Sequence, residues 1–316
     1  MSVYHTPVMF GETLDALVKN PSGIYADVTF GGGGHTAGIL SRLNEDGHVI
    51  AFDRDADALK NSIDDKRLTM VRGDFRFIRN FILQIAHERE DLRERLEDGL
   101  DGILADLGVS SHQFDTADRG FSFRYDAPLD MRMNQEGGQT AADVVNEYPQ
   151  DDLERIFRIY GEVENSGKVA ALVASARANA RIETTGDLDK AIAPVLPKFA
   201  EHKYLAKVYQ ALRIEVNHEM RSLEKFLEGA PATLKEGGLL AVITYHSLED
   251  RMVKNFIKCG RIDGKENKDM FGVVIAPLEA VNRKPVTPEE DEIASNTRAR
   301  SAKLRVARKK SQNGGR

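Results

Sequence analysis

The chain has 316 residues, of which 41% are hydrophobic, so it can bury a sizeable core in one large domain or two modest ones. No apolar run approaches the roughly 18 residues that cross a bilayer, and residues 1–10 lack a signal-peptide pattern, so neither a membrane protein nor an exported one is expected. The single cysteine, Cys259, excludes an internal disulfide framework and favours the cytoplasm, while the net charge of −6 argues weakly against nucleic-acid binding.

The first third of the chain alternates short apolar runs with amphipathic segments. Strands are predicted at residues 24–30, 48–53, 68–71 and 101–107, and helices at residues 37–43, from residue 56 and around residues 77–85. Strands that are apolar throughout and separated by helices indicate a parallel sheet covered on both faces. Crossovers of one hand bring the C-terminal ends of such strands to one edge, where we expect the functional residues.

Four consecutive glycines follow the first predicted strand, between Asp27 and His35. Glycine lets the backbone turn tightly and approach a ligand closely. Asp53 ends the second strand 20 residues after Gly33, where an acid can accept both ribose hydroxyls of an adenosine-containing cofactor. The frame that begins at Gly31 fits the Gly-x-Gly-x-x-Gly turn of a dinucleotide site poorly, which favours S-adenosylmethionine over NAD. A plain strand–helix turn with a solvated Asp53 is the structural alternative.

The alternation stops after residue 111. Residues 114–138 are rich in Gly, Asp and Arg without a strand-like run, and residues 141–214 have the apolar spacing of helices. We therefore expect a helical insertion that interrupts the sheet domain. The predicted boundaries are 1–113 and 216–305 for the two parts of the sheet domain, 114–215 for the insertion, and 306–316 for a basic tail.

The sheet pattern returns near the end of the chain. A strand is predicted at residues 238–245, a helix from residue 247 to about 258, and a late antiparallel strand at residues 302–306. Eight cations and no acid lie in residues 298–316, namely Arg298, Arg300, Lys303, Arg305, Arg308, Lys309, Lys310 and Arg316. Such a basic end can contact the phosphates of a nucleic acid, or it can be a solvated tail.

Several motifs along the whole chain resemble those of one family. They are HTPVM at 5–9, TFGGGGH at 29–35, FDRD at 52–55, DLGVSS at 106–111, RGFSF at 119–123, LDMRM at 129–133, QALRIEVN at 210–217, HSLEDR at 246–251 and RARSAKLR at 298–305. Together they are similar to the bacterial 16S ribosomal RNA cytosine-N4 methyltransferases, the small-subunit methyltransferase H or MraW family. The resemblance implies a class I S-adenosylmethionine-dependent methyltransferase fold, a Rossmann-like and mostly parallel α/β sheet, with an inserted all-helical domain.

The resemblance also implies a substrate and a set of contacts. The substrate would be the N4 amino group of a cytidine in the decoding region of 16S ribosomal RNA, within the small ribosomal subunit. Carried over by motif, the cofactor contacts fall on Gly33, Gly34, His35, Asp53, Phe75, Asp106 and Gln113. Phe75 would offer adenine an apolar surface, although ordinary core packing is the alternative. Asn217 enters as a substrate contact only through the family motif, as does Arg213.

The chemistry of such a reaction asks for alignment and for a hydrogen-bond acceptor facing the amino group. Asp106, at the end of a buried strand, is the candidate for that acceptor or for positioning the cofactor. Ser110 and Ser111 could hold the edge of the base, or could form only local turn hydrogen bonds. His246 follows another strand to the same edge and is a further catalytic candidate, against the commoner role of a structural histidine.

Other reactions fit the residues less well. Methylation at carbon-5 of cytosine needs a thiolate, and Cys259 lies at the far end of the helix that follows His246. A metal mechanism is not expected, because the eight histidines form no ligand pair at short spacing. The Asp/Asn-Pro-Pro-aromatic motif of many amino-methyltransferases is absent after Asp106, so the residue that stacks on the base is not identified. A nicotinamide-dependent oxidoreductase and a non-catalytic ribosome assembly factor are the competing functions, and the oligomeric state is not predicted.

Overall fold

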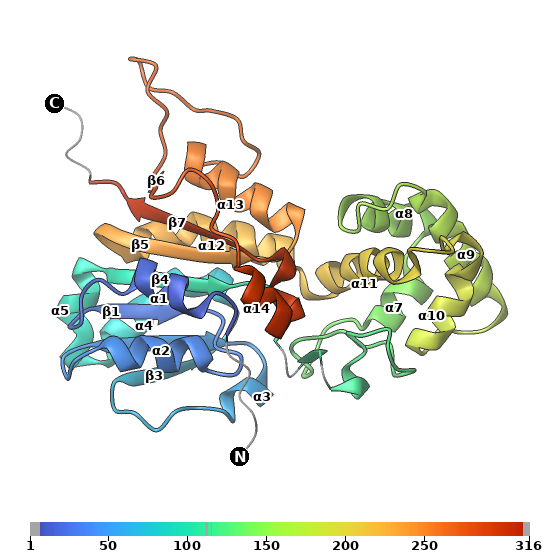
Figure 1. The fold of residues 1–316 in the computed structure, drawn as a ribbon, viewed down its shortest axis with the longest axis horizontal. Helices are drawn as coiled ribbons and strands as arrows, with labels where there is room; N and C mark the ends of the chain where they lie inside the picture. Colours follow the sequence, from blue (N-terminus) through green and yellow to red (C-terminus); the bar gives the residue numbers. More distant parts are fainter. Residues whose placement is uncertain (1–6, 111–112, 115, 312–316) are drawn as a thin grey trace. The chain divides into compact units, whose positions relative to one another are not determined.

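The computed structural model describes residues 7–110, 113–114 and 116–311, and the chain divides into two compact units (Figure 1). Unit 1 consists of Met1–Gly108 and Met220–Arg316, and unit 2 of Val109–Glu219. The helical insertion expected at 114–215 therefore lies within unit 2. Within the described ranges, no helix combines the length and the apolar character that a membrane span needs.

Unit 1 is built on a sheet of seven strands in the order β3-β2-β1-β4-β5-β7-β6. The strands are β1 (Ile24–Asp27), β2 (His48–Asp53), β3 (Leu68–Arg72), β4 (Leu100–Asp106), β5 (Leu234–Thr244), β6 (Leu278–Ala280) and β7 (Lys303–Lys309). The first five pair in parallel, whereas β7 runs antiparallel to both β5 and β6. The predicted Rossmann-like, mostly parallel sheet with a late antiparallel strand is confirmed. The short strand β6 was not predicted, because only one of its three residues is buried.

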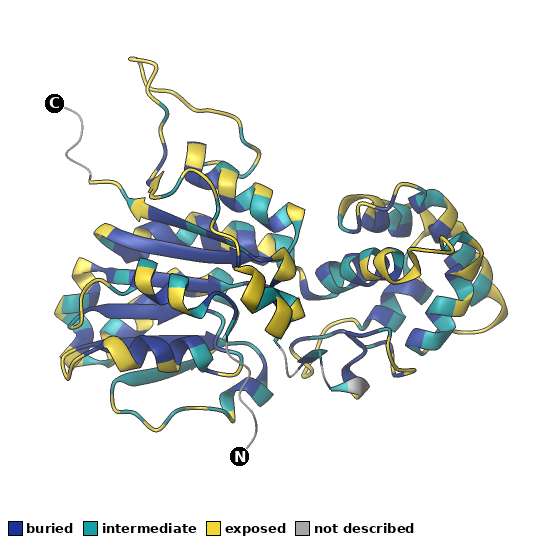
Figure 2. Ribbon diagram, viewed as in Figure 1, coloured by how far each residue is buried: buried dark blue, intermediate teal, exposed yellow. Residues whose placement is uncertain are grey.

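Helices cover both faces of this sheet, as continuous burial along the strands requires (Figure 2). The helices of unit 1 are α1 (Phe10–Leu17), α2 (Gly34–Arg42), α3 (Ala56–Leu59), α4 (Ile78–Glu88), α5 (Glu90–Asp98), α12 (Glu219–Thr233), α13 (Ser247–Cys259) and α14 (Glu290–Ser295). One face packs Ile78, Ile82 and Phe226 against the sheet, and the other packs Leu14, Leu17 and Ile39.

Two strand ends differ from the sequence prediction. The first strand ends at Asp27 rather than at residue 30, because the Asp27 carboxylate accepts the backbone N–H of Thr29 and turns the chain. The last strand continues to Lys309, so residues 306–309 pair in the sheet instead of beginning the predicted tail.

Three cations of the basic end make internal contacts. Arg305 Nε donates to Asp250 Oδ1 over 2.7 Å, and Lys303 pairs with the same carboxylate at 3.4 Å. The Lys309 ammonium donates to the backbone carbonyl of Leu234. The sequence offered these three cations as phosphate contacts, but each is held within unit 1.

Unit 2 contains the helices that the apolar spacing of residues 141–214 predicted. They are α7 (Ala141–Glu147), α8 (Gln150–Ile159), α9 (Ser166–Asn179), α10 (Thr185–Ile192) and α11 (Glu201–Asn217). Capping boxes begin two of them, with Thr140 ahead of α7 and Thr184 ahead of α10. The unit has a hydrophobic core of its own, in which Phe157, Val173 and Leu212 are fully buried.

Candidate active site

The C-terminal ends of β2, β1, β4 and β5 lie side by side at one edge of the sheet, because these strands are parallel neighbours. The sequence predicted that the glycine turn, Asp53 and Asp106 meet at this edge. Gly31 N–H donates to Asp53 Oδ2 over 2.8 Å, which joins the turn after β1 to the end of β2. Asp106 N–H donates to Thr29 Oγ1 over 2.6 Å, which joins the end of β4 to the same turn. All three therefore form one edge of unit 1.

The turn after β1 needs glycine at specific positions. Gly31 and Gly33 have φ angles of 54° and 77°, in the left-handed region that other residues rarely adopt. A Cβ atom at Gly33 would also lie 2.8 Å from the ring of Phe30, and one at Gly34 would lie 2.4 Å from Pro7. At Gly32 a Cβ atom would meet nothing within 4 Å. The backbone is thus open to a ligand at Gly32 and tightly packed on the other side.

Asp53 is positioned by two backbone groups. Its Oδ2 accepts the N–H of Gly31 and its Oδ1 accepts the N–H of Asp55, each over 2.8 Å. An ionised carboxylate offers about four acceptor positions, so each oxygen keeps one for a hydroxyl. Burial raises the pKa of Asp53, and the two backbone hydrogen bonds oppose that rise. The arrangement holds a carboxylate ready to accept a pair of hydroxyl groups.

A second buried carboxylate fixes the start of α2. Asp27 is fully buried, and its Oδ2 accepts the hydroxyl proton of Thr36 over 2.7 Å. Burial raises the pKa of Asp27. These contacts tie β1 to α2 and shape the glycine turn between them.

Asp106 has a perturbed environment at this edge. Burial, with a smaller contribution from the Glu249 charge, raises its pKa to about 7, against a hydrogen bond from Tyr245 that lowers it. Tyr245 Oη donates to Asp106 Oδ1 over 2.7 Å. The side chain of Asp106 is 22% exposed, so it is accessible from the edge. A carboxyl group with these properties changes its charge near neutral pH. Sequence reasoning missed Tyr245, for which the only signal was its place after β5, the strand beside β4.

Replacing Tyr245 by phenylalanine should raise the pKa of Asp106 further, because the substitution removes a donor that favours the carboxylate. For any activity that requires ionised Asp106, the acid limb of the pH–rate profile should then shift to higher pH by about one unit. The rate on the alkaline plateau should change little. Rate profiles of both proteins between about pH 5 and 9, on both sides of the raised pKa, would measure the shift. Superimposable profiles would contradict this role of Tyr245.

His35, predicted as a cofactor contact, lies at the same edge. Its side chain is 6% exposed, and its Nδ1 is 3.5 Å from Asp106 Oδ2. Burial lowers the pKa of His35, so the ring is neutral at physiological pH and makes no ion pair there. Its buried Nε2 has no hydrogen-bond partner among the residues that the structure describes.

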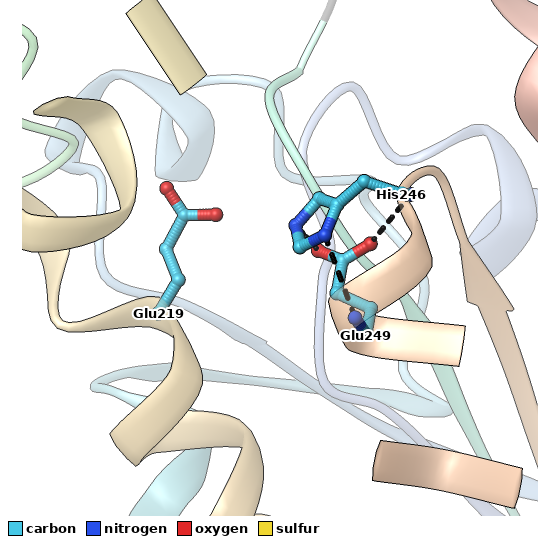
Figure 3. A group of neighbouring side chains, drawn as sticks. All are labelled: Glu219, His246 and Glu249. Atoms are coloured by element: carbon cyan, nitrogen blue, oxygen red, sulfur yellow. Dashed lines mark hydrogen bonds and ion pairs between the residues drawn. The ribbon is translucent and has the colours of Figure 1, made fainter. Parts of the chain in front are cut away.

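His246 is held as the cap of a helix. It is the N-cap of α13, and its Nδ1 accepts the backbone N–H of Glu249 over 3.4 Å. Its Nε2 is 3.0 Å from Glu249 Oε1, so both ring nitrogens face that one residue (Figure 3). Glu219, also drawn there, belongs to unit 2, where both of its oxygens accept from Arg213 over 2.9 Å. The contacts of His246 favour the structural role over the catalytic one.

Phe75 follows β3 and combines the two roles considered for it. It packs edge-to-face against Phe226, with ring centroids 5.4 Å apart, and it is half-buried. Asp74 orients it by capping the 3-10 helix Phe75–Phe77, and Ser222 Oγ donates to Asp74 Oδ2 over 3.0 Å. Phe75 is thus a core residue with part of its surface left for a ligand.

Several of the predicted residues belong to unit 2, among them Ser110, Gln113 and Asn217. Ser110 and Gln113 hydrogen-bond each other, with each backbone N–H donating to the other side chain over 3.2 Å. Asn217 is buried, and its amide bonds the backbones of Met131, Met133 and Arg213. These contacts hold a turn and anchor the end of α11, respectively. Ser111, a predicted substrate contact, lies outside the described residues.

Comparison with known proteins finds relatives along the whole chain. A sequence model of the MraW methylase family matches residues 2–310. The chain is 52% identical over 309 residues to the protein named ribosomal RNA small subunit methyltransferase H of Bacteroides fragilis, covering 98% of each chain. It is 51% identical over 308 residues to the protein of that name from Phocaeicola vulgatus, again covering 98% of each. Among solved structures, NSun6 from Pyrococcus horikoshii with SFG matches with a TM-score of 0.42 and 13% identity. The match covers 97% of this chain and 53% of that one. A likeness this low says nothing about the reaction.

Proposed function

The chain belongs to the MraW methylase family, and from that premise we propose that it methylates the N4 amino group of a cytidine in the decoding region of 16S ribosomal RNA. The methyl donor is S-adenosylmethionine, and the substrate is 16S ribosomal RNA, either as free RNA or within the small ribosomal subunit. Relatives about half identical over nearly the whole chain are named as small-subunit ribosomal RNA methyltransferases, which supports the substrate class. The observation that carries the reaction is the convergence of the glycine turn, Asp53 and Asp106 at one edge of the sheet.

The residues at this edge fit S-adenosylmethionine. Asp53 keeps acceptor positions for the two ribose hydroxyls, and the backbone at Gly32 is open to the amino-acid end of the molecule. The partly exposed ring of Phe75 suits adenine. When bound, S-adenosylmethionine supplies a methyl group on a positively charged sulfur, which is already strongly electrophilic.

The protein's own contribution to the reaction is alignment and charge stabilisation. The N4 lone pair of cytosine is delocalised into the ring, so the amine is a weak nucleophile and develops positive charge as it reacts. Asp106, when ionised, accepts a hydrogen bond from the amino group and stabilises that charge. Tyr245 holds Oδ1 of Asp106, so we assign the contact with the amino group to Oδ2, which lies 3.5 Å from Nδ1 of the neutral His35 ring. The pKa of about 7 means that the acceptor forms as the pH rises through neutrality.

Two other reactions are less well supported. Carbon-5 methylation needs a thiolate, whereas Cys259 is buried at the last residue of α13 and its Sγ donates to the Asn255 carbonyl over 3.1 Å. Hydride transfer with NAD needs a pyrophosphate turn, and the family of this chain is a methylase family. A non-catalytic assembly factor would have no need for a buried carboxylate with a pKa near 7 at the active edge.

Incubation with labelled S-adenosylmethionine and small subunits that lack the modification tests the proposal directly. Digestion of the RNA and nucleoside mass spectrometry should identify N4-methylated cytidine in the decoding region. Label on another base, on carbon-5 of cytosine or on protein would overturn the assignment. Transfer to naked 16S RNA, compared with transfer to assembled subunits, would identify which of them is the substrate.

A further inference from the structure

The exposed face of α13 carries a row of cations. The helix begins directly after Tyr245 at the active edge of unit 1 and buries Val253, Phe256 and Ile257 against the core. The residues that it exposes are Ser247, Arg251, Lys254 and Lys258. Spacings of three and four residues place the cations on one side of a helix, over about 10 Å along its axis.

The acids of α13 do not offset these cations. Glu249 is buried at the helix N-terminus, where it takes part in the capping box. Asp250 is bound by Arg305 and Lys303 of β7. No acid of α13 is therefore exposed on the face that carries Arg251, Lys254 and Lys258.

A loop with an apolar tip follows the helix directly. In Figure 1 it is the long orange segment that extends away from the sheet of unit 1 between α13 and β6. Met270 and Phe271 at its tip are 89% and 83% exposed, and Val273 and Ile275 behind them are more than half exposed.

The tip is held by specific hydrogen bonds. Asp269 Oδ1 accepts the backbone N–H groups of Phe271 and Val273 over 2.8 and 2.9 Å. The Asp269 N–H donates to the Val273 carbonyl, and a β-bridge joins Lys268 to Val274 below the tip. A defined turn thus exposes an aromatic ring to solvent. Exposed apolar surface does not stabilise the fold, so a patch of this kind indicates an interaction site.

Two acids of the loop pair with cations, whereas the third, Asp269, accepts the backbone N–H groups of the tip. Asp263 pairs with Arg261 at 2.7 Å, and Glu266 pairs with Lys258 at 3.0 Å and with Lys268 at 3.2 Å. Lys254 and Lys265 have no ion pair within the described part of the chain. Lys254 on α13 and Lys265 in the loop therefore remain available to contact phosphates.

We propose that the outward face of α13 and the tip of the 261–277 loop form a surface for single-stranded RNA, with phosphates on the cations and an unpaired base stacked on Phe271. Single-stranded RNA is recognised by aromatic stacking together with cations along its backbone, which is the combination found here. An apolar tip alone would also suit a protein, but an excess of cations over acids along the outward face of α13 and the loop favours a polyanion. The surface starts at the active edge, so it would hold RNA that flanks the target nucleotide. This inference rests on the proposed function.

A new tryptophan can report on the stacking, because the chain contains none. Phe271→Trp should show saturable fluorescence quenching on titration with a short oligouridylate or an unmodified 16S RNA fragment. The midpoint should match that of RNA binding measured by anisotropy. Leu83→Trp, at a position on α4 that is 62% exposed, is the matched control and should not be quenched.

Two further variants separate stacking from charge. Phe271→Ala should weaken binding of the same RNA by about 5- to 100-fold at every salt concentration, with an unchanged salt slope. Lys254→Ala should lower the slope of log K against log salt by about 0.7, the value for one phosphate contact on a single strand. Lys66→Ala, which removes an exposed lysine before β3, should leave affinity and slope unchanged.

The outcomes distinguish this surface from the function on which it rests. RNA binding without quenching of Phe271→Trp would overturn the proposed surface. If Phe271→Ala weakens binding to intact subunits but not to RNA, the proposal is also overturned, and a ribosomal protein is indicated as the partner. Failure of the wild-type protein to methylate small subunits, with quenching intact, would reject the proposed function and leave an RNA-binding surface.

Discussion

Asp106→Asn should reduce methyl transfer at pH 8 by about 10- to 100-fold, which is the loss of one hydrogen bond to a charged acceptor in the transition state. The variant keeps the shape of the side chain and an oxygen that can accept from Tyr245. Its residual activity should lack the rise with pH near 7 that ionisation of Asp106 confers on the wild type. Single-turnover rates with saturating cofactor and subunits would measure the effect on the chemical step.

The same substitution should make the protein more stable at neutral and alkaline pH. The folded-state pKa of Asp106, about 7, lies above its ordinary value of 3.8, so ionisation of this group opposes folding. Below about pH 4 the variant and the wild type should have the same free energy of unfolding. The variant's advantage should grow between pH 4 and 7 and stay at up to about 4 kcal/mol above pH 7. Denaturant unfolding at pH 4 and pH 8 measures the difference.

A combined loss of activity and gain of stability is the signature of a carboxylate held for function. An equal loss of both would instead identify Asp106 as a structural residue. Full activity in Asp106→Asn would remove it from the mechanism. Asp101→Asn is a matched control, since Asp101 begins the same strand at the opposite edge and should leave the pH profile unchanged.

Asp53→Ala should weaken binding of S-adenosylmethionine by about 100-fold or more, because two hydrogen bonds from the ribose to a charged acceptor are lost. The rate at saturating cofactor should change much less, since Asp53 acts on binding and not on the reacting atoms. Calorimetric titration gives the dissociation constant, and the KM for the cofactor should rise in parallel.

A structural role of Asp53 has to be separated from a binding role, because its carboxylate also accepts the N–H groups of Gly31 and Asp55. A cofactor analogue without one ribose hydroxyl provides the control. It should bind the wild type weakly and the Asp53→Ala protein no worse than S-adenosylmethionine does. If the variant still discriminates between the two ligands, the ribose contact lies elsewhere.

Much of the fold was predictable because it depends on local pattern. Residues 48–53 form a strand and residues 247–259 a helix, close to the ranges that their apolar periodicity predicted. The meeting of Gly31, Asp53 and Asp106 followed from topology, since parallel strands end at one edge whatever packs around them. These features of the candidate site need only secondary structure and the handedness of crossovers.

The state of each side chain was not predictable in this way. The pKa of Asp106 depends on burial and on Tyr245, which is 139 positions away in the sequence. His246 was a weaker catalytic candidate than Asp106 in the sequence, and only its contacts with Glu249 identified it as a helix cap. Likewise, Arg305 in the basic end forms an ion pair with Asp250, a partner that no sequence pattern indicates.

The sequence by itself thus determined that the parallel strands end at one edge and which residue types lie there, because periodicity and chain direction act over a few residues at a time. Only the tertiary structure decided which of those groups are charged, which are already bonded and which face outward. Burial and hydrogen bonding between distant segments set those properties, and they appear only when the strands and helices have packed.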